Sequence, residues 1–249
     1  PEEWIKDLGE MGVLGMVVPE EYGCAGMSYT AYGVVCRELE RGDSGLRSFC
    51  SVQGSLSMHP IHKFGTEEQK HKYLPKMATG EIIGCFGLTE PDYGSNPGGM
   101  VTKAEKVDGG YVLNGAKMWI TNGPQADVLV VYATVDPQLG SKGITAFLIE
   151  KTQTGFTTGT KLDKLGMRGS DTAELIFEDC RVPKTQILGR VGEGVRILMS
   201  GLDYERAVLA AGPIGIMQAC MDVVLPYVHD RKQFGQPIGE FQLMQGKLA

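Results

Sequence analysis

Residues 84–123 read GCFGLTEPDYGSNPGGMVTKAEKVDGGYVLNGAKMWITNG, and this stretch decides the fold. It begins inside a short apolar run, residues 82–88, which breaks into a turn rich in Gly, Pro, Asp and Asn. The second part alternates between polar and apolar residues, as half-buried strands do. Asp108-Gly109-Gly110 marks a hairpin turn, because Gly supplies the positive φ that such turns need. The stretch therefore predicts paired strands within a β-rich domain.

Two strand ends in this stretch carry groups suited to a flat, polar ligand. They are Leu88-Thr89-Glu90 and Trp119-Ile120-Thr121, and each offers backbone N–H groups, a hydroxyl and an apolar or aromatic body. A flavin ring needs hydrogen-bond donors along its polar edge and packing against its face. The two ends therefore favour a flavin site, and the alternative is a plain hairpin in a β-domain.

The same residues resemble the acyl-CoA dehydrogenase family of flavoenzymes. The matching motifs are Leu88-Thr89-Glu90-Pro91 with Gly94-Ser95, followed by Trp119-Ile120-Thr121-Asn122, and the resemblance runs along the whole chain. The chain departs from the family pattern at Tyr93 and Asn96, which concerns the substrate loop rather than the flavin site.

We expect an α+β fold of three parts. Residues 1–83 have helical spacing, residues 84–193 contain strands separated by turns rich in Gly and Asp, and residues 194–249 return to helical spacing. By the resemblance, these are an N-terminal helical domain, a middle domain like a β-barrel, and the first helices of a C-terminal helical bundle.

Local signals place several helix boundaries. Ser28 is a candidate N-cap, and Thr66 with Gln69 forms a capping box. Gly212-Pro213 predicts a kink and Pro226 a second irregularity, because proline removes a helical hydrogen bond. We expect a helix to end around residues 231–235 and the last one to start at Gln242.

Composition excludes several classes of protein. The chain has 249 residues, of which 42% are hydrophobic, and this is enough for a sizeable core. Its net charge of −6 argues against nucleic-acid binding, so an anionic CoA ester must be held by local cations. The six cysteines include no CxxC motif, which indicates reduced thiols in an intracellular compartment. The four histidines lack the spacing of metal ligands, so we expect no metal site.

The ends of the chain and its apolar runs give further expectations. We expect no membrane span, since no apolar run approaches the necessary length. No targeting peptide is visible. The chain starts at Pro1 without Met, and residues 245–249 stop within a helical pattern, so we expect a part of a longer protein.

Glu205 is the carboxylate that most suggests catalysis. On a helix it shares a face with Leu202, Val208 and Leu209. Burial on an apolar face raises the pKa of a carboxyl group, and a general base near neutral pH requires a raised pKa. The alternative is a core Glu that is paired with a distant partner. Asp203 and Arg206 are placed to pair with each other.

The resemblance assigns roles to residues of the second half. Gly201-Leu202-Asp203-Tyr204-Glu205-Arg206 resembles the segment that carries the catalytic Glu in the isovaleryl-CoA branch, which implies that Glu205 is the base. The implied reaction is α,β-dehydrogenation: the base takes the α-proton of an acyl-CoA thioester, and the β-hydrogen leaves as hydride to flavin N5. The implied FAD contacts are Phe86, Leu88, Thr89, Trp119, Ile120, Thr121, Arg231, Phe234 and Gln242. The implied acyl-CoA contacts are Ser95, Asp203, Tyr204 and Arg206.

The first half resembles a different branch. Residues 20–122 are similar to glutaryl-CoA dehydrogenases, in which the residues matching Glu40, Arg47 and Ser51 meet the distal carboxylate of the substrate. Arg47 is therefore a candidate substrate contact, and the alternative is a surface or interhelix salt bridge. The second half carries the base, so we expect isovaleryl-CoA-type activity, with glutaryl-CoA-type activity as the alternative.

Other functions stay open, and the resemblance also implies partners. A flavin oxidase of the same fold, a non-enzymatic flavin- or CoA-binding module and a helical scaffold are the alternatives. The implied cofactor is FAD, and the implied electron acceptor is an electron-transfer flavoprotein. Arg231, Phe234 and Gln242 match positions that hold the FAD of a neighbouring subunit, which implies a homo-oligomer such as a tetramer. The implied location is the mitochondrial matrix in a eukaryote or the cytoplasm in a bacterium.

Overall fold

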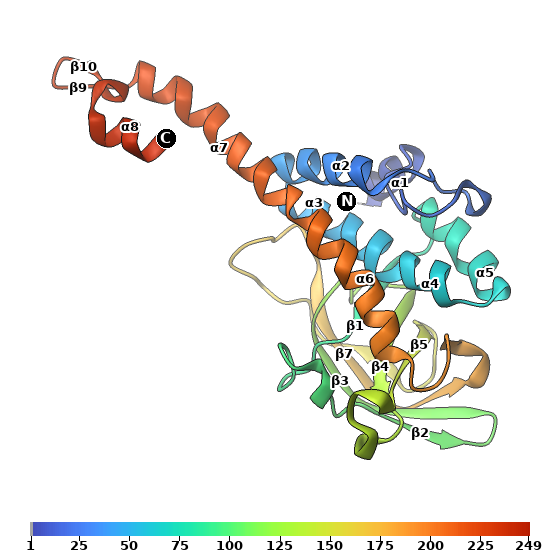
Figure 1. Ribbon diagram of the computed structural model, residues 1–249. Coiled ribbons are helices and arrows are strands. Elements are labelled where there is room, and N and C mark those ends of the chain that lie inside the picture. Colours follow the sequence, from blue (N-terminus) through green and yellow to red (C-terminus); the bar gives the residue numbers. More distant parts are fainter. Residues whose placement is uncertain (1) are drawn as a thin grey trace.

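The computed structural model describes residues 2–249. Helices form a layer over a β-domain, and a long C-terminal helix crosses both and projects as an arm (Figure 1). The N-terminal helices are α1 (Glu2–Glu10), α2 (Tyr29–Gly42), α3 (Ser44–Ser51), α4 (His59–Phe64) and α5 (Glu67–Ala78).

The predicted caps explain where these helices begin. The Ser28 hydroxyl accepts a hydrogen bond from the Ala31 N–H and starts α2, as expected. The capping box is confirmed: the Gln69 N–H donates to the Thr66 hydroxyl at 3.2 Å, and the Thr66 N–H donates to the Gln69 side chain at 3.0 Å. The Gln69 amide also donates to the backbone carbonyls of Thr185 and Ile187, so this cap fastens α5 to the β-domain.

Strands of the middle domain form one sheet. They are β1 (Gly84–Gly87), β2 (Lys103–Val107), β3 (Gly110–Thr121), β4 (Val128–Thr134), β5 (Ile144–Glu150), β6 (Phe156–Thr158), β7 (Thr172–Pro183) and β8 (Ile187–Leu188). The order is β6-β7-β3-β2-β4-β5-β8, and β1 runs parallel to β4. The predicted hairpin joins β2 to β3, with Gly109 at φ 77°.

The C-terminal segment is almost one continuous helix. Helix α6 (Gly194–Leu209) is followed by α7 (Ala211–Asp230) after a break at Ala210. The helix is interrupted close to the place where the kink was predicted, where Pro213 has no N–H to donate to the Leu209 carbonyl. The irregularity expected at Pro226 is wrong, since α7 continues through it. A hairpin of β9 (Lys232–Gln233) and β10 (Gln236–Pro237) then leads to α8 (Gln242–Leu248).

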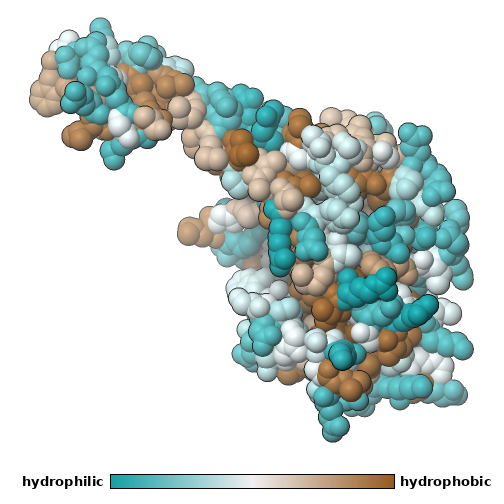
Figure 2. All heavy atoms as spheres, viewed as in Figure 1, coloured by the Kyte–Doolittle hydropathy of each residue, from teal (hydrophilic) through white to brown (hydrophobic). Residues whose placement is uncertain are grey.

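One helix bears on the expectation that the chain has no membrane span, which stays an expectation. The helix spanning Gly194–Asp230 is 37 residues long and, by length and composition alone, long and apolar enough to cross a membrane. No charged residue lies between Arg206 and Asp222. Apolar side chains lie exposed along the arm (Figure 2).

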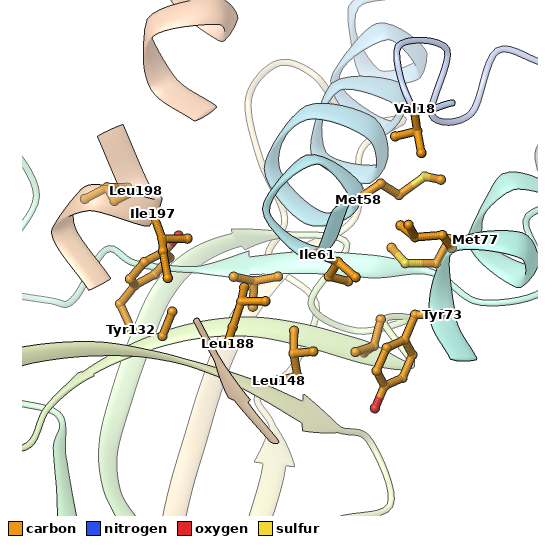
Figure 3. Close-up of a cluster of buried hydrophobic side chains, with 14 of the residues drawn as sticks. Val18, Met58, Ile61, Tyr73, Met77, Tyr132, Leu148, Leu188, Ile197 and Leu198 are labelled. Atoms are coloured by element: carbon orange, nitrogen blue, oxygen red, sulfur yellow. The ribbon is translucent and has the colours of Figure 1, made fainter. Parts of the chain in front are cut away.

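Two apolar cores lie on the two faces of the sheet. One is inside the β-domain and includes Leu113, Phe147 and Phe177. The other joins the sheet to the helices, where Tyr132 and Leu148 of the strands meet Ile61 of α4 and Ile197 of α6 (Figure 3). Phe86 and Leu88 at the end of β1 and Leu202 of α6 pack against this second core. The second core thus connects the strand ends to the helix that carries Glu205.

Candidate functional site

The two predicted strand ends lie side by side. The Met118 N–H donates to the Thr89 carbonyl at 2.8 Å, which ties the segment after β1 to β3. Between Lys117 and Ile120 the register of β3 against β7 shifts, because β3 has an extra residue there. Trp119 sits in this bulge with φ 62°, a left-handed conformation that few non-glycine residues adopt.

The bulge changes which side chains point outward. Lys117 and Ile120 are both buried, whereas Trp119 is 62% exposed. Thr89 and Thr121 are partly exposed beside it. An exposed indole next to two hydroxyl-bearing strand ends fits the face and the polar edge of a flavin. Leu88, Thr89, Trp119 and Thr121 therefore fit FAD. The side chain of Ile120 instead lies in the core inside the β-domain, away from these partly exposed residues.

A buried ion pair that the sequence pattern did not predict lies beneath these strand ends. Lys117 Nζ lies 2.8 Å from Glu90 Oε1, and the two side chains are 0% and 1% exposed. The Lys117 ammonium also donates to the Leu88 carbonyl at 3.2 Å. Burial lowers the pKa of Lys117 to about 8, while the neighbouring Glu90 opposes that shift. The sequence did contain one sign of this pair: Lys117 occupies an inward-facing position of an alternating strand, and a buried lysine usually has a charged partner.

Glu205 is buried on α6, as the periodicity predicted. Burial raises the pKa of Glu205 above its ordinary value, and the hydroxyls of Ser55 and Ser51 and the charge of Arg47 act in the opposite direction. Its Oε2 atom is buried and has no hydrogen-bond partner among residues 2–249. A buried carboxylate with one free oxygen can accept a proton from a substrate.

Arg47 belongs to a buried network next to Glu205. Its Nε atom donates to Glu40 Oε2, its Nη2 atom donates to Glu40 Oε1 at 3.3 Å, and its Nη1 atom donates to the Ser51 hydroxyl at 3.2 Å. The network links α2 to α3, so the geometry contains the interhelix salt bridge that was the alternative for Arg47. It also brings together the three residues that match the glutaryl-CoA branch.

The backbone of α7 closes over this network. A Cβ atom added at Gly212 would lie 2.0 Å from Glu40 Oε2, so a larger residue there would displace the Glu40 carboxylate from its place in the network.

The other expected acyl-CoA contacts lie outside this buried network. The Tyr204 ring stacks on Tyr29 with centroids 4.4 Å apart and planes 4° apart, and His59 meets it edge-on. Burial lowers the pKa of His59 to about 4, so this imidazole is neutral. Asp203 and Arg206 form the predicted pair at 3.9 Å on the exposed face of α6. Ser95 is exposed in the turn after β1.

The remaining FAD candidates stand apart from the strand ends. Arg231, Phe234 and Gln242 lie on the hairpin and helix at the tip of the arm, far from the β-domain (Figure 1). Phe234 is 93% exposed with φ 56°, and its ring meets Phe241 edge-on. The part of the chain that the structure describes holds no group of His, Cys, Asp and Glu side chains arranged to bind a metal ion.

Domain models of a single family match nearly the whole chain. The N-terminal, middle and C-terminal domains of acyl-CoA dehydrogenase match residues 1–81, 85–180 and 192–249. The chain belongs to the acyl-CoA dehydrogenase family. This confirms the predicted resemblance and the predicted fold class.

Relatives of this acyl-CoA dehydrogenase chain include both branches seen in its sequence. It is 56% identical to mitochondrial isovaleryl-CoA dehydrogenase of Solanum tuberosum over 98% of this chain and 59% of that protein. It is 54% identical to mitochondrial 2-methylacyl-CoA dehydrogenase of the same plant, with 98% and 59% covered. Glutaryl-CoA dehydrogenase from Mycobacterium smegmatis in complex with FADH2 superimposes with a TM-score of 0.93 at 45% identity, covering 100% of this chain and 62% of that one. The chain thus spans about three fifths of the length of these relatives.

Proposed function

We propose that the protein catalyses FAD-dependent α,β-dehydrogenation of a short, branched acyl-CoA thioester. One observation carries the proposal: buried Glu205 lies one helical turn after Leu202, which packs on the same core as the strand end that carries Leu88. The proposed proton acceptor, Glu205, and the strand end that carries Leu88 are therefore supported by the same apolar core. The isovaleryl-CoA and 2-methylacyl-CoA dehydrogenases among the relatives support this class of substrate.

Glu205 and the residues of the strand ends have separate roles in the proposed reaction. The free Oε2 atom of Glu205 takes the proton from the carbon next to the thioester carbonyl. Leu88, Thr89, Trp119 and Thr121 hold the flavin ring, with Trp119 packing on it and the threonines binding its polar edge. FAD, when bound, accepts the hydride that leaves the β-carbon.

The charge around Glu205 favours a neutral acyl chain. Arg47 is already neutralised by Glu40, so the network offers no unpaired cation to a second substrate carboxylate. A distal carboxylate would also approach the charge of Glu205 itself. An unpaired charge in a closed pocket is heavily disfavoured.

A glutaryl-type substrate is the second candidate. The observation that favours it is the convergence of Glu40, Arg47 and Ser51 next to Glu205, since these match the residues of that branch. A distal carboxylate could take the place of the Ser51 hydroxyl on Arg47. The two candidates differ in which acyl-CoA reduces the flavin faster.

The tip of the arm suggests how FAD sites are completed. Arg231 offers a planar pair of charged donors suited to a pyrophosphate, and Phe234 is exposed beside it. Both stand far from the strand ends of their own chain, so we infer that they serve the FAD of a second subunit in a homo-oligomer such as a tetramer. The electron acceptor proposed is an electron-transfer flavoprotein, and the location is the mitochondrial matrix in a eukaryote or the cytoplasm in a bacterium.

The first test is the colour of the protein. We expect the purified protein to bind FAD non-covalently and to show flavin absorbance. Absence of that absorbance after addition of excess FAD would contradict the proposed function. Rapid reoxidation of the reduced flavin by oxygen would instead identify an oxidase of the same fold.

Arg231→Ala should weaken FAD retention without unfolding the subunit. Loss of a hydrogen bond to a charged group costs about 1.5–3 kcal/mol, which corresponds to a rise in the Kd for FAD of about 10- to 150-fold. Fluorescence titration with FAD measures the Kd, and circular dichroism checks the fold. Lys232→Ala, at the neighbouring exposed position, is the control. Unchanged FAD affinity in Arg231→Ala would refute the assignment.

A further inference from the structure

Glu90 and Lys117 connect the two strand ends that are proposed to hold the flavin. None of the contacts proposed above involves either residue. Glu90 follows Leu88 and Thr89, and Lys117 precedes Met118 and Trp119. Their ion pair is buried on both sides. A lysine with no exposed surface is rare unless it is paired, because burying its charge alone is costly.

The hydrogen bonds of Glu90 and Lys117 reach the backbone on both sides of the turn. Glu90 Oε1 accepts from Lys117 at 2.8 Å and from the Thr102 N–H at 3.0 Å, and Glu90 Oε2 accepts from the Val101 N–H at 2.7 Å. The carboxylate thus closes the turn that runs from residue 91 to residue 100. Lys117 in turn donates to the Leu88 carbonyl at 3.2 Å.

The ion pair and one backbone bond together determine how the two strand ends meet. The Met118 N–H donates to the Thr89 carbonyl, and Lys117 holds the residues on both sides of Thr89. The extra residue in β3 begins directly after Lys117, and it is this bulge that turns Trp119 outward. Lys117 therefore fixes the inward side of the bulge while Trp119 occupies the outward side.

We propose that Glu90 and Lys117 are positioning residues for the flavin, and that their ion pair sets the position of Thr89 relative to Trp119. This inference rests on the proposed function, because it assigns the pair to the FAD site. The ion pair does not touch the reacting atoms. It acts through the two strand ends, which must be held in a fixed geometry to bind one rigid ring.

A double substitution separates positioning from simple stability. Removing one partner leaves a buried charge unpaired and is expected to destabilise the fold, whereas replacing both with neutral side chains of similar volume can restore stability. We therefore compare Lys117→Met, Glu90→Gln and the double variant Lys117→Met/Glu90→Gln. Lys76→Met, which removes a lysine from the exposed Lys76–Glu81 pair, is the matched control.

The readouts are the thermal midpoint of unfolding, the Kd for FAD and the fluorescence of bound flavin. We expect the double variant to be more stable than either single variant but less stable than the wild type, because an amide at position 90 can accept only one of the hydrogen bonds from the Val101 and Thr102 N–H groups. Its Kd should stay raised about tenfold and its bound flavin should be more fluorescent, because a displaced Trp119 quenches it less. Substrate reduction of the flavin should fall about 100-fold, as expected for a site misplaced by about 1 Å. The control should match the wild type throughout.

One result would contradict the positioning role alone, and another would contradict both that role and the proposed function. If the double variant regains stability, FAD affinity and flavin fluorescence together, the pair is only structural and the positioning role is wrong, while the proposed function stands. If the wild-type protein shows no flavin absorbance with excess FAD, the proposed function fails and the positioning role fails with it.

Discussion

Glu205→Gln is expected to slow reduction of the bound flavin by isovaleryl-CoA about 10²- to 10⁴-fold, the usual contribution of a positioned general base. The substitution keeps the size and shape of the side chain, so the affinities for FAD and acyl-CoA should stay nearly unchanged. Anaerobic stopped-flow absorbance of the flavin measures the rate. Glu193→Gln, at the start of the same helix, is the control and should behave as the wild type.

Stability separates this role from a structural one. Burial raises the pKa of Glu205 in the folded protein above that of the unfolded chain. The folded state therefore holds this proton more tightly, and its stability falls as pH rises from the ordinary carboxyl pKa through the raised one. Above that range Glu205→Gln should be as stable as the wild type or more so. A variant that is less stable and still active would show that Glu205 is a structural core residue.

Arg47→Ala is expected to lower the free energy of unfolding by about 3–5 kcal/mol, because it leaves Glu40 buried without its partner. Arg41→Ala is the matched control. Arg41 contacts Glu38 and Asp222 near the surface, with about half of its side chain exposed. Such exposed pairs contribute about 0–1 kcal/mol. Chemical denaturation of both variants measures the difference, and equal losses would show that the Arg47 pair is not buried in solution.

The substrate role of Arg47 needs a variant that folds. Glu40→Gln/Arg47→Met replaces the ion pair with neutral side chains of similar volume, which removes the charge without leaving a partner unpaired. If Arg47 binds a distal carboxylate, this variant should lose activity with glutaryl-CoA and keep it with isovaleryl-CoA. If Arg47 is only an interhelix contact, the ratio of the two activities should not change.

Signals between residues near in sequence predicted most of the fold. The Thr66–Gln69 capping box, the turn at Gly109 and the interruption caused by Pro213 each depend on a few adjacent residues, and the structure contains all three. Burial of Glu205 followed from apolar neighbours on its own helix. These features need no knowledge of how distant segments pack.

Contacts between distant segments could not be read from local patterns. Glu90 and Lys117 are 27 positions apart and meet only because the segment after β1 packs beside the bulge of β3. The resemblance implied that Ile120 contacts the flavin, and the extra residue in β3 turns its side chain into the core inside the β-domain. The helical pattern of the arm was predicted from residue 194 onward, but local spacing gave no sign that α7 would extend beyond the rest of the fold.

The most direct test of the account is an anaerobic titration of the FAD-loaded protein with isovaleryl-CoA and with glutaryl-CoA, in the wild type and in Glu205→Gln. The account predicts that isovaleryl-CoA bleaches the wild-type flavin faster than glutaryl-CoA does, and that Glu205→Gln loses this reaction. Rapid bleaching by glutaryl-CoA that persists in Glu205→Gln and disappears in Glu40→Gln/Arg47→Met would contradict both the substrate and the base.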